Sequence, residues 1–560
     1  MQSICTSIAA ALAITGLAAA NAAHGEPTPE AKERQATAQP LPPTAALPPE
    51  GGLVGAVDLG GHVRTAHRTS AASKKRILQS IREHSRRFGP FTAPGTRGTF
   101  DPFPIFPVGA RESVDLIMNN YVDLDSNEGG IQDWNCGSYT YDGSYADNGL
   151  LMSFDHQLVG VPVFAVLDGT VNDIVDSEPD QNAESSSMPT NYIGIHHGGD
   201  RYTYYQDLKQ NSALVEVGQE VRGGEQIAMA ASSGGGNWPG LEFSTWVPNG
   251  DETWDYLEPY TGECNPGPSG WMNQVDVPVD PVCRDFGIST TNLTDFYSNE
   301  IYSWRPPTEG FITLDHDLLW MWTQSTDVGP FSTYQMRFYD PSGFLAHETG
   351  TQWFNSTWNT YRYFHTYFAW NLEGLHTTPG TWTVNMIVNG APYIDFQLEV
   401  LETGETLANR PPEPIIASIG AVAPAAEDIL TCNVYTQEVD DLDWDLVRFQ
   451  YVWSIGGKVV RNTISAGKAD HLPRLEGCDA AVVQCLVFPS DGQAYGLPYT
   501  TKVRLAGEST GDCNCDGSVD ILDLLVVLSE WGPCSICSGD HNRDGRVDVF
   551  DLLAVISAWG

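Results

Sequence analysis

Short runs of alternating hydrophobic and polar residues, separated by glycine-rich turns, dominate the middle of the chain. Between about residues 130 and 262 these runs read VPVFAVLDGTVNDIV, NYIGIHH, RYTYYQDL and GGEQIAMAAS. Alternation with a period of two is typical of β-strands that bury one face. The pattern therefore predicts a β-sheet domain, which we place at residues 130–275.

Two further strand-rich regions follow, and both are expected to form β-sandwiches. Residues 290–405 end in GTWTVNMIVNGAPYIDFQLEVL, in which the Asn-Gly pair predicts a hairpin turn. Residues 412–506 contain DILTCNVYT, VRFQYVWSIGGKVV and AAVVQCLVF. Cys432 and Cys485 would lie on facing strands around Trp453, which is the arrangement of an immunoglobulin-like domain. The fold class is therefore mainly β and multidomain.

The beginning of the chain lacks this strand pattern. An apolar run that ends in small residues predicts a signal peptide over residues 1–23, so the protein is expected to be secreted or held at the cell surface. No later segment has 18 consecutive apolar residues, so no membrane span is expected. Residues 24–52 are rich in Pro, Ala, Glu and Gln and are predicted to be a disordered linker.

Residues 53–129 form an N-terminal region in which one basic helix is predicted. The stretch SAASKKRILQSIREHSRRFG offers Ser73 as a helix cap and Gly89 as a stop signal. Its basic residues could contact an anionic cell-wall polymer, but a solvated helix face is the favoured interpretation.

The charge and the cysteine content of the chain exclude some classes of function and favour others. Acidic residues outnumber basic residues by 71 to 29, and nucleic-acid binding is not expected because phosphate contacts need clustered Lys and Arg. Apart from Cys5 in the predicted signal peptide, ten of the 11 cysteines remain. An even number favours disulfides in an exported protein. Their pairing stays open, and Cys478 is the odd cysteine of the second sandwich, either free or paired elsewhere.

The last fifty residues contain an internal repeat with the pattern of a calcium site. The segment DCNCDGSVDILDLLVVLSEWG is followed by DHNRDGRVDVFDLLAVISAWG. Each copy has acidic or amide residues at loop positions 1, 3, 5, 9 and 12 and a glycine at position 6. Calcium takes six to eight oxygen ligands, and the glycine allows the sharp turn between them. The expected ligands, with Ser518 and Arg546 acting through their carbonyl groups, are Asp512, Asn514, Asp516, Ser518, Asp520, Asp523, Asp540, Asn542, Asp544, Arg546, Asp548 and Asp551.

This repeat resembles a type I dockerin, an α-helical module with paired EF-hand-like loops, and we place it at residues 511–560. The resemblance implies two bound calcium ions and a cohesin-like protein as partner. At loop positions 10 and 11 the chain departs from cellulosomal dockerins, because Ile521–Leu522 and Val549–Phe550 replace small hydroxyl residues.

The middle of the chain carries a second resemblance. VGVPVFAVLDGTV, YIGIHHGGDRYTYYQDL and VEVGQEVRGGEQIAMAASSGGGNWPGLEF are similar, in order and spacing, to blocks of the lysostaphin and LytM-type zinc endopeptidases. The resemblance implies a compact, mostly antiparallel β-sheet groove and peptidoglycan or a polysaccharide as binding partner. In that family a His-x-x-x-Asp stretch and the second histidine of His-x-His hold zinc. The first histidine of that pair and the histidine of Tyr-x-His assist the reaction.

All five of those positions differ in this chain. They fall on Ser144, Asn148, Asp207, Gly240 and Glu242. Serine, asparagine and glycine do not hold zinc in such a site, and two carboxylates alone are too few for a catalytic zinc ion. Zinc is therefore not expected, and the domain is expected to share the fold without the catalytic residues.

Four other residues are alternatives for a rebuilt site. His156, His196 and His197 lie in the same region, and a structural role is favoured for the last two because they follow a strand. Asp147 could replace Asn148 by a one-residue slip, but nothing restores the histidines.

Three functions therefore compete. The first is a secreted, non-catalytic protein whose groove binds peptide or glycan and whose last module attaches it to another protein. The second is an active zinc metalloendopeptidase with a non-standard ligand set. The third is a carbohydrate-binding protein that stacks sugars on aromatic rings, although core packing is the default for such rings. Its candidate residues are Trp304, Trp320, Trp322, Trp353, Trp358, Trp370 and Trp382.

Overall fold

The computed structural model is mainly β, as the alternating pattern predicts. It describes residues 52–58, 71–88, 101–181, 189–198, 201–234, 238–248, 254–277, 280–299, 303–329, 331–354, 361–371, 376–420, 428–437, 439–475, 478–508 and 510–559. Within these ranges no helix is both long and apolar enough to cross a membrane. The predicted signal peptide and almost all of the predicted linker lie outside the described residues.

An eight-stranded sheet occupies the first strand-rich region. Its order is β2-β3-β10-β7-β6-β5-β8, with β11 paired to β10, and neighbouring strands are antiparallel. The strands are β2 (Ile117–Asn120), β3 (Asp147–Leu150), β5 (Gly169–Val175), β6 (Tyr192–His196), β7 (Tyr202–Gln206), β8 (Glu220–Val221), β10 (Gly240–Pro248) and β11 (Trp254–Leu257). A small second sheet pairs β4 (Pro162–Phe164) with β9 (Gln226–Met229). The short helix α4 (Phe154–Val159) precedes β4.

One face of this sheet forms the main core of the domain. Phe243 of β10, Tyr205 of β7 and Ile193 of β6 are completely buried there, together with Val163 of β4. A disulfide between Cys136 and Cys264 ties the loop before β3 to the segment after β11. The core thus lies between the large sheet and the small one.

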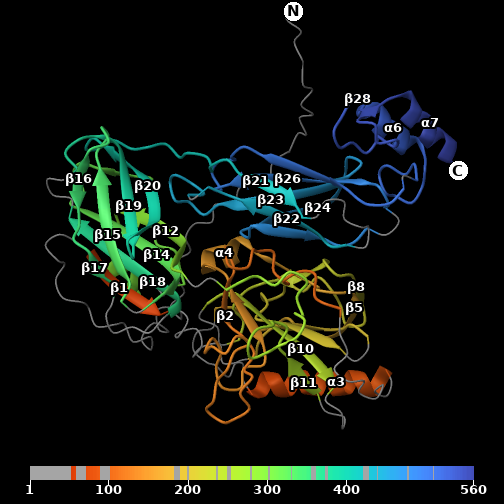
Figure 1. Ribbon diagram of the computed structural model, residues 1–560, viewed down its shortest axis with the longest axis horizontal. Helices are drawn as coiled ribbons and strands as arrows, with labels where there is room; N and C mark the ends of the chain where they lie inside the picture. Colours follow the sequence, from red (N-terminus) through yellow and green to blue (C-terminus); the bar gives the residue numbers. More distant parts are fainter. Residues whose placement is uncertain are drawn as a thin grey trace, which may run out of the picture. The chain divides into compact units, whose positions relative to one another are not determined.

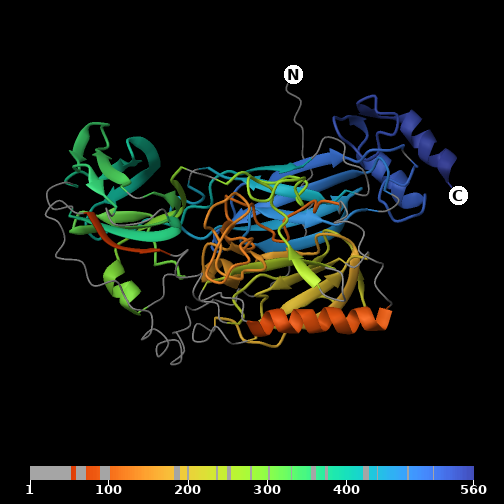
Figure 2. The same ribbon diagram turned by 60° about the horizontal axis from the view of Figure 1, so that its bottom comes forward.

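The helix α3 (Ala71–Phe88) covers the other face of the large sheet (Figures 1 and 2). Ile77 and Ile81 are fully buried. They pack in one cluster with the aromatic side chains of Tyr145, Tyr192, Tyr202, Tyr204, Trp246 and Trp254. The predicted helix is confirmed, but it begins at Ala71, so Ser73 lies inside it. Only its basic side is exposed, because the aromatic sheet face buries the apolar side.

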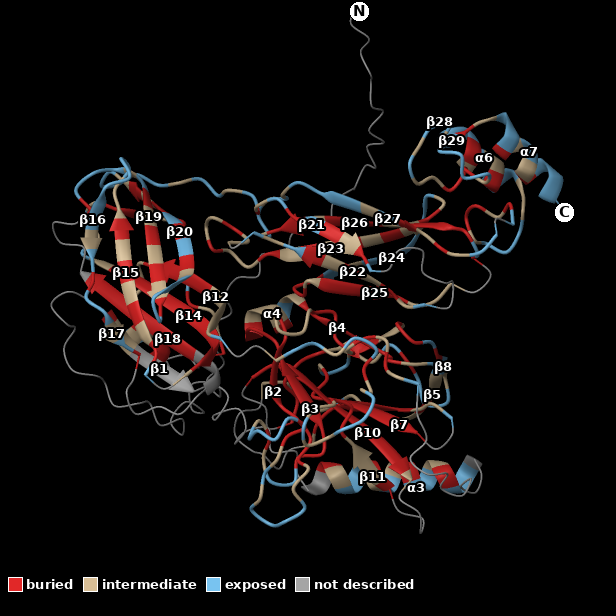
Figure 3. Cartoon of the chain, in the orientation of Figure 1, coloured by how far each residue is buried: buried red, intermediate tan, exposed pale blue. Residues whose placement is uncertain are grey.

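The first sandwich consists of a four-stranded and a six-stranded sheet. Their orders are β1-β18-β14-β12 and β13-β20-β19-β15-β16, with β17 paired to β15. The strands are β1 (Gly52–Asp58), β12 (Val282–Ser289), β13 (Phe311–Thr313), β14 (Leu318–Val328), β15 (Thr333–Tyr339), β16 (Leu345–Glu348), β17 (Gln352–Trp353), β18 (Tyr361–Asn371), β19 (Gly380–Val388) and β20 (Ala391–Leu401). Figure 3 shows the alternation of buried and partly exposed residues along β15 and β19.

Two features of this sandwich bear on the sequence predictions. The expected hairpin turn lies between β19 and β20, where the φ angle is 52° at Asn389 and 83° at Gly390. The edge strand β1 was not expected. It belongs to the N-terminal region of the chain, far in sequence from the strand β18 with which it pairs. Helix α5 (Leu293–Asn299) covers the outer face of the four-stranded sheet.

The second sandwich packs a three-stranded sheet against a four-stranded sheet. Their orders are β21-β22-β25 and β24-β23-β26-β27. The strands are β21 (Ile416–Ile419), β22 (Leu430–Tyr435), β23 (Arg448–Ile455), β24 (Lys458–Ser465), β25 (Ala469–Leu472), β26 (Val482–Ser490) and β27 (Tyr499–Arg504). Cys432 of β22 and Cys485 of β26 are buried in its core beside Trp453 of β23. Cys478, the odd cysteine, is bonded to Cys515.

The C-terminal repeat folds into two loop–helix units. The helices are α6 (Ile521–Ser529) and α7 (Val549–Ala558), and the short strands β28 (Gly532–Pro533) and β29 (Arg546–Val547) pair between them. Val527, Val547 and Val555 form its small buried core with Cys513.

The second sandwich contacts the domain of the large sheet through residues just before β25. Ala466 belongs to the core of that domain. The backbone N–H of Lys468 donates to Asp115 Oδ2 over 2.6 Å. Gly467 lies so close to Gly109 that a Cβ on it would collide with the Gly109 carbonyl oxygen. Bulkier residues at position 467 would therefore disturb this contact.

Candidate functional site

A row of polar side chains crosses the large sheet where the resemblance places the zinc ligands. Strand register aligns Asn120 of β2, Asn148 of β3, Glu242 of β10, Gln206 of β7 and Tyr192 of β6. Directly opposed residues of neighbouring strands point to the same face. The structure thus brings together two of the five predicted positions, Asn148 and Glu242.

Neutral amides flank the carboxylate of Glu242 in this row. Asn148 Oδ1 and Gln206 Nε2 are buried and have no hydrogen-bond partner among the described residues. Catalytic zinc needs imidazole, thiolate or carboxylate ligands, usually three, and an amide substitutes poorly for any of them. The row therefore offers a single strong ligand, Glu242.

The side chain of Tyr145 lies beside these residues. Its hydroxyl donates to Gln206 Oε1 over 3.4 Å. Burial, and next the charge of Glu242, raises the pKa of Tyr145 well above its ordinary value, and Asp207 acts in the same direction. Tyr145 therefore remains a neutral phenol that fills space in the cluster.

Ser144 and Asp207, two other predicted positions, take part in local hydrogen bonds. Ser144 Oγ accepts from Asn120 Nδ2 over 3.3 Å and donates to the Ala146 carbonyl over 3.2 Å. Asp207 Oδ1 accepts a hydrogen bond from Thr190 Oγ1 over 2.9 Å, and the backbone φ angle of Asp207 is 64°. Both side chains contribute to turns that follow or precede strands.

Gly240, the fifth position, begins strand β10 in a tight place. Its N–H donates to the Ala231 carbonyl over 2.6 Å, and it pairs with Leu150 of β3. A Cβ at this position would collide with the Gly149 carbonyl oxygen. The backbone therefore excludes the histidine that the family places there.

Helix α3 removes this face of the sheet from solvent. The most exposed of the four side chains at the predicted positions is Asp207, at 5%. The Lys74 ammonium lies 4.4 Å from the ring centroid of Tyr256 and 5.6 Å from that of Tyr145. Ser80 Oγ accepts from Tyr204 Oη over 3.0 Å. A catalytic metal keeps an open position for water or substrate, and this covered face provides none.

His196 does not approach Glu242. It pairs with Tyr202, whereas Gln206 pairs with Tyr192, so the two positions are four residues apart along β6 and β7, or about 13 Å at 3.3 Å per residue. The ring of His196 lies 5.0 Å from that of His84 in α3. Burial, followed by the charge of His196, lowers the pKa of His84 to about 4.

His197 and His156 are also engaged away from the row. His197 lies 2.7 Å from Thr203 Oγ1 through Nε2 and 2.7 Å from the Asp168 carbonyl through Nδ1, which fits the structural role expected of it. His156 Nδ1 lies 2.9 Å from Ser153 Oγ in the first turn of α4.

Asp147 does not replace Asn148. It is opposite Phe243 in the register, so it points to the other face of the sheet. There it meets Glu258, and burial followed by the charge of Glu258 raises the pKa of Asp147 well above its ordinary value. Burial likewise raises the pKa of Glu258 to about 8. The two carboxyls form a buried acidic pair that sequence analysis did not find.

No rebuilt metal site emerges from these residues. In the part of the chain that the structure describes, no group of three or more His, Cys, Asp or Glu side chains is arranged to hold a metal ion. Sequence analysis also did not predict that helix α3 covers the sheet face on which Glu242 lies. The available signal was the i, i+4 spacing of Ile77 and Ile81, which indicates one apolar side on the basic helix.

The tryptophans of the first sandwich mostly belong to its core. Trp320, Trp322, Trp370 and Trp382 are buried, whereas Trp353 is 56% exposed. Trp304 packs against Phe154 with ring centroids 5.2 Å apart, and Trp358 lies outside the described residues. The described tryptophans therefore form no row of solvent-facing rings.

The two C-terminal loops have matching hydrogen bonds. Asp523 Oδ1 accepts from the Cys513 N–H over 2.7 Å, and Asp551 Oδ1 accepts from the His541 N–H over 2.8 Å. The N–H groups of Gly517 and Gly545 donate to the first aspartate of their loops. All ten acidic and amide residues predicted as ligands thus lie in two equivalent turns at the starts of α6 and α7.

The large-sheet domain is similar in sequence to a known protein family. Residues 152–254 match the family model described as Peptidase family M23. Among solved structures, a mutant catalytic domain of the prophage-encoded M23 protein EnpA from Enterococcus faecalis is 15% identical, with 29% of this chain and 95% of that chain covered and a TM-score of 0.19. The catalytic domain of lysostaphin from Staphylococcus simulans is 20% identical, with 25% and 85% covered and a TM-score of 0.17.

A zinc-containing peptidase from Vibrio cholerae is 19% identical, with 29% of this chain and 40% of that chain covered and a TM-score of 0.16. The family-model match includes Asp207, Gly240 and Glu242 and begins after Ser144 and Asn148. The large-sheet region of this chain therefore contains a peptidase M23 domain.

Proposed function

We propose that this M23 domain is a non-catalytic module of an exported, peptidoglycan-related protein. The observation that carries the proposal is the closed face of the sheet, on which Tyr145 and α3 lie over the positions of the zinc ligands. Glu242 and Asp207 are the two carboxylates left there, and neither is joined by a histidine of the family pattern. Zinc would find too few ligands and no open position.

Zinc content tests this proposal directly. The full chain is purified, equilibrated with micromolar zinc, dialysed and measured by elemental analysis, with lysostaphin as the active control. We expect substoichiometric zinc and no hydrolysis of peptidoglycan. One tightly bound zinc ion per chain, lost in a Glu242→Gln variant, would support instead the alternative of an active metalloendopeptidase with a non-standard ligand set.

We also propose that residues 511–560 form a dockerin module that binds two calcium ions. The support is the duplicated pattern of oxygen side chains and the matched turns around Asp523 and Asp551. Six to eight oxygens per loop become available when the carbonyl groups of Ser518 and Arg546 are included. An immunoglobulin-like second sandwich between the M23 domain and this module would serve as a spacer.

Calcium removal tests the dockerin proposal. We expect EDTA to increase hydrogen exchange across residues 512–559 while exchange in the two sandwiches is unchanged. An Asp523→Asn, Asp551→Asn double variant should behave in calcium as the native chain does in EDTA. Equal exchange with and without calcium would contradict the proposal.

The module is expected to attach the protein to a cohesin-like partner through an apolar surface. The hydrophobic residues exposed on its two helices include Ile521, Leu522, Leu525 and Leu528 on α6 and Val549, Phe550, Leu553 and Ile556 on α7. Exposed apolar surface commonly marks a protein-binding site, and these side chains lie on both helices of the module.

Binding of peptidoglycan peptide or glycan by the M23 domain would require α3 to move. Sedimentation with purified peptidoglycan compares the native chain with an Ile77→Asp variant that loosens α3. We expect the variant to bind more strongly. Equal binding would mean that any glycan uses another surface, such as the aromatic residues of the first sandwich.

A further inference from the structure

The strongest unassigned feature of the molecule is a pair of exposed aromatic rings at one edge of the first sandwich. Phe331 is 62% exposed and Trp353 is 56% exposed. Their ring centroids lie 6.3 Å apart, and the two ring planes are at 84° to each other. Large aromatic side chains gain free energy when they leave water. Two neighbouring rings in solvent therefore point to a ligand that covers them.

The backbone holds Phe331 in this exposed place against its conformational preference. Its φ angle is 65°, a left-handed conformation that is rare for a bulky side chain. The next residues fix it there, because Asn389 Oδ1 accepts from the Thr333 N–H over 2.9 Å and Asn389 Nδ2 donates to Ser332 Oγ over 3.3 Å. Backbone strain that the surroundings enforce in this way is most common where a protein binds a ligand.

Trp353 lies on the outer face of the six-stranded sheet. It is opposite Thr333 in the register, and directly opposed residues of neighbouring strands share a face. Gln335 and Arg337 follow Thr333 on the same side of β15, because alternate residues of a strand point the same way. Arg337 Nε donates to Glu348 Oε1 on the neighbouring strand β16 over 2.6 Å. The tryptophan ring is thus followed by side chains that offer both donors and acceptors.

These polar side chains hold one another in place and still face solvent. Gln335 Nε2 donates to the Thr349 carbonyl over 3.1 Å, and Arg337 Nη2 donates to Gln335 Oε1 over 3.5 Å. The side chains of Arg337 and Glu348 remain 38% and 37% exposed. A guanidinium carries five N–H donors, and a carboxylate accepts several hydrogen bonds. The group can therefore bind the hydroxyl groups of a ligand without first rearranging.

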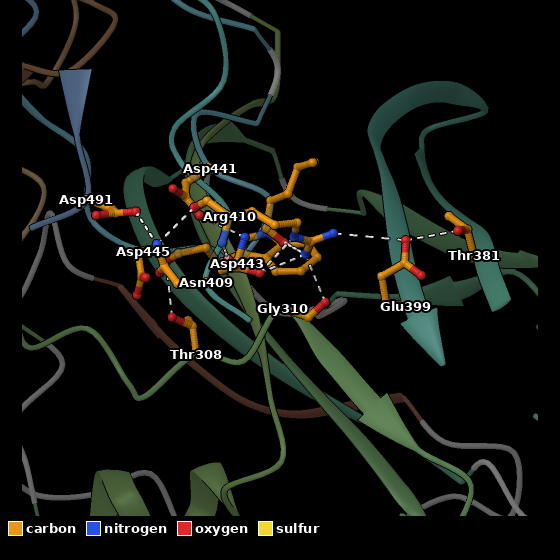
Figure 4. A network of polar contacts seen from close by, with 12 residues as sticks. Thr308, Gly310, Thr381, Glu399, Asn409, Arg410, Asp441, Asp443, Asp445 and Asp491 are labelled. Carbon is orange, nitrogen blue, oxygen red and sulfur yellow. Dashed lines mark hydrogen bonds and ion pairs between the residues drawn. The ribbon is translucent and has the colours of Figure 1, made fainter. Parts of the chain in front are cut away.

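The charges of this face favour a neutral ligand. Arg337 is paired with Glu348, and on the strand β20 the carboxylate of Glu399 lies 4.0 Å from Arg410. Glu399 also accepts from Thr381 Oγ1 of β19 over 2.9 Å, as Figure 4 shows. An anionic polymer is bound by clustered cations that can face it, whereas each of these two arginines already faces a carboxylate. A neutral ligand with many hydroxyl groups fits the face better.

We propose that Phe331, Trp353, Gln335, Arg337 and Glu348 form a binding site for a neutral polysaccharide. A pyranose ring has a face of C–H groups, which packs on an aromatic ring, and a rim of hydroxyl groups, which form hydrogen bonds. Trp353 takes the C–H face of one sugar, and the polar side chains bind the hydroxyl groups of its neighbours. The rows of Trp353 and Arg337 are four residues apart on β15, or about 13 Å, so the ligand is a chain of sugars. A protein partner would instead need a continuous apolar core at its interface.

Retention of the full chain on insoluble polysaccharides tests the proposal. Cellulose and chitin are the probes, because both are neutral chains of β-linked pyranoses and chitin adds an N-acetyl group. We expect the native chain to bind at least one of them, and Trp353→Ala to bind it about tenfold more weakly, since one stacking contact is lost. The matched control Tyr495→Ala removes an exposed ring of the second sandwich and should bind as the native chain does. Trp353→Tyr keeps a ring and should bind more strongly than Trp353→Ala.

The outcomes separate this site from the M23 domain and from a protein partner. Ile77→Asp, which loosens α3, should leave retention unchanged, so a failure of this proposal does not affect the proposal for the M23 domain. Retention on neither polysaccharide, or equal retention of the native chain and Trp353→Ala, would overturn the proposal. Binding that is lost in Ile77→Asp but kept in Trp353→Ala would place the polysaccharide on the M23 domain. Retention on an immobilised proline-rich peptide, with none on cellulose or chitin, would assign the two rings to a protein partner instead.

Discussion

At the scale of residues, burial and backbone packing close the sheet face of the M23 domain on which Asn148 and Glu242 lie. Gly240 shows this most clearly, because the adjacent Gly149 carbonyl leaves no room for a side chain. The face of the sheet that would hold a metal contains amides and a neutral tyrosine around Glu242. A histidine introduced at position 240 would therefore clash with the backbone of β3 before it could bind a metal ion.

Gly240→Ala is expected to destabilise the protein. The added Cβ collides with backbone atoms of β3, which cannot rotate away, and overpacking of this kind costs about 1–3 kcal/mol. The control is Gly350→Ala, at an exposed glycine with nothing within 4 Å of the new Cβ, and it should change the free energy of unfolding by less than about 0.5 kcal/mol. Urea denaturation measures both. Equal midpoints for the two variants would contradict the tight packing at position 240.

The acidic pair of Asp147 and Glu258 predicts a specific pH dependence. Burial raises the pKa of Glu258 to about 8 from its ordinary value of 4.5. The folded chain therefore keeps a proton that the unfolded chain loses, and the free energy of unfolding should fall as the pH rises from 4.5 to 8. Asp147 contributes in the same direction.

Glu258→Gln should flatten this slope, because glutamine does not titrate and keeps one oxygen for the N–H of Tyr260. Denaturation midpoints at a series of pH values give the measurement. A slope in the variant equal to that of the native chain would assign the pH dependence to other groups.

At the scale of elements, α3 is the part that decides whether the sheet face is open. Its basic side faces solvent, and its apolar side supplies Ile77 and Ile81 to the aromatic cluster of the sheet. The helix is thus held by tertiary packing, which usually contributes more to helix stability than intrinsic propensity.

Ile81→Ala is expected to cost about 2–5 kcal/mol, because it removes methyl and methylene groups from a fully buried site. Gln79→Ala is the control on the same helix. It removes only the exposed hydrogen bond to Glu83, which should matter by less than about 0.5 kcal/mol. Thermal unfolding of Ile81→Ala and Gln79→Ala measures the loss of stability in each variant. No difference between Ile81→Ala and the control would show that α3 does not pack on the sheet in solution.

At the scale of the whole molecule, the M23 domain and the second sandwich share a contact at which two backbones nearly touch. Gly467 faces Gly109 there, Ala466 belongs to the M23 core, and Lys468 donates its N–H to Asp115. The Arg461 guanidinium joins Asp470 of its own domain and Gln226 of the M23 domain. The two domains are therefore expected to unfold as one cooperative unit.

Gly467→Ala should break this cooperativity, because its Cβ collides with the Gly109 carbonyl oxygen. We expect one calorimetric transition of the native chain to split into two, with faster hydrogen exchange at residues 109–115. Gly350→Ala again serves as control. A single unchanged transition in Gly467→Ala would show that the contact does not couple the domains.

Sequence alone determined the features that depend on local pattern. Period-two alternation located the strands, the Asn-Gly pair located the hairpin at Asn389, and the blocks of the M23 family identified that domain. The interpretation that five positions of the family's site are replaced also comes from the sequence alone. These signals are local because each depends on neighbouring residues or on a short motif.

Tertiary structure decided what surrounds those positions. Only the fold brings α3 from a distant segment onto the sheet, places β1 at the edge of the first sandwich, and turns Asp147 toward Glu258. Register and packing between distant segments set these contacts, and no local pattern of hydrophobic and polar residues encodes them.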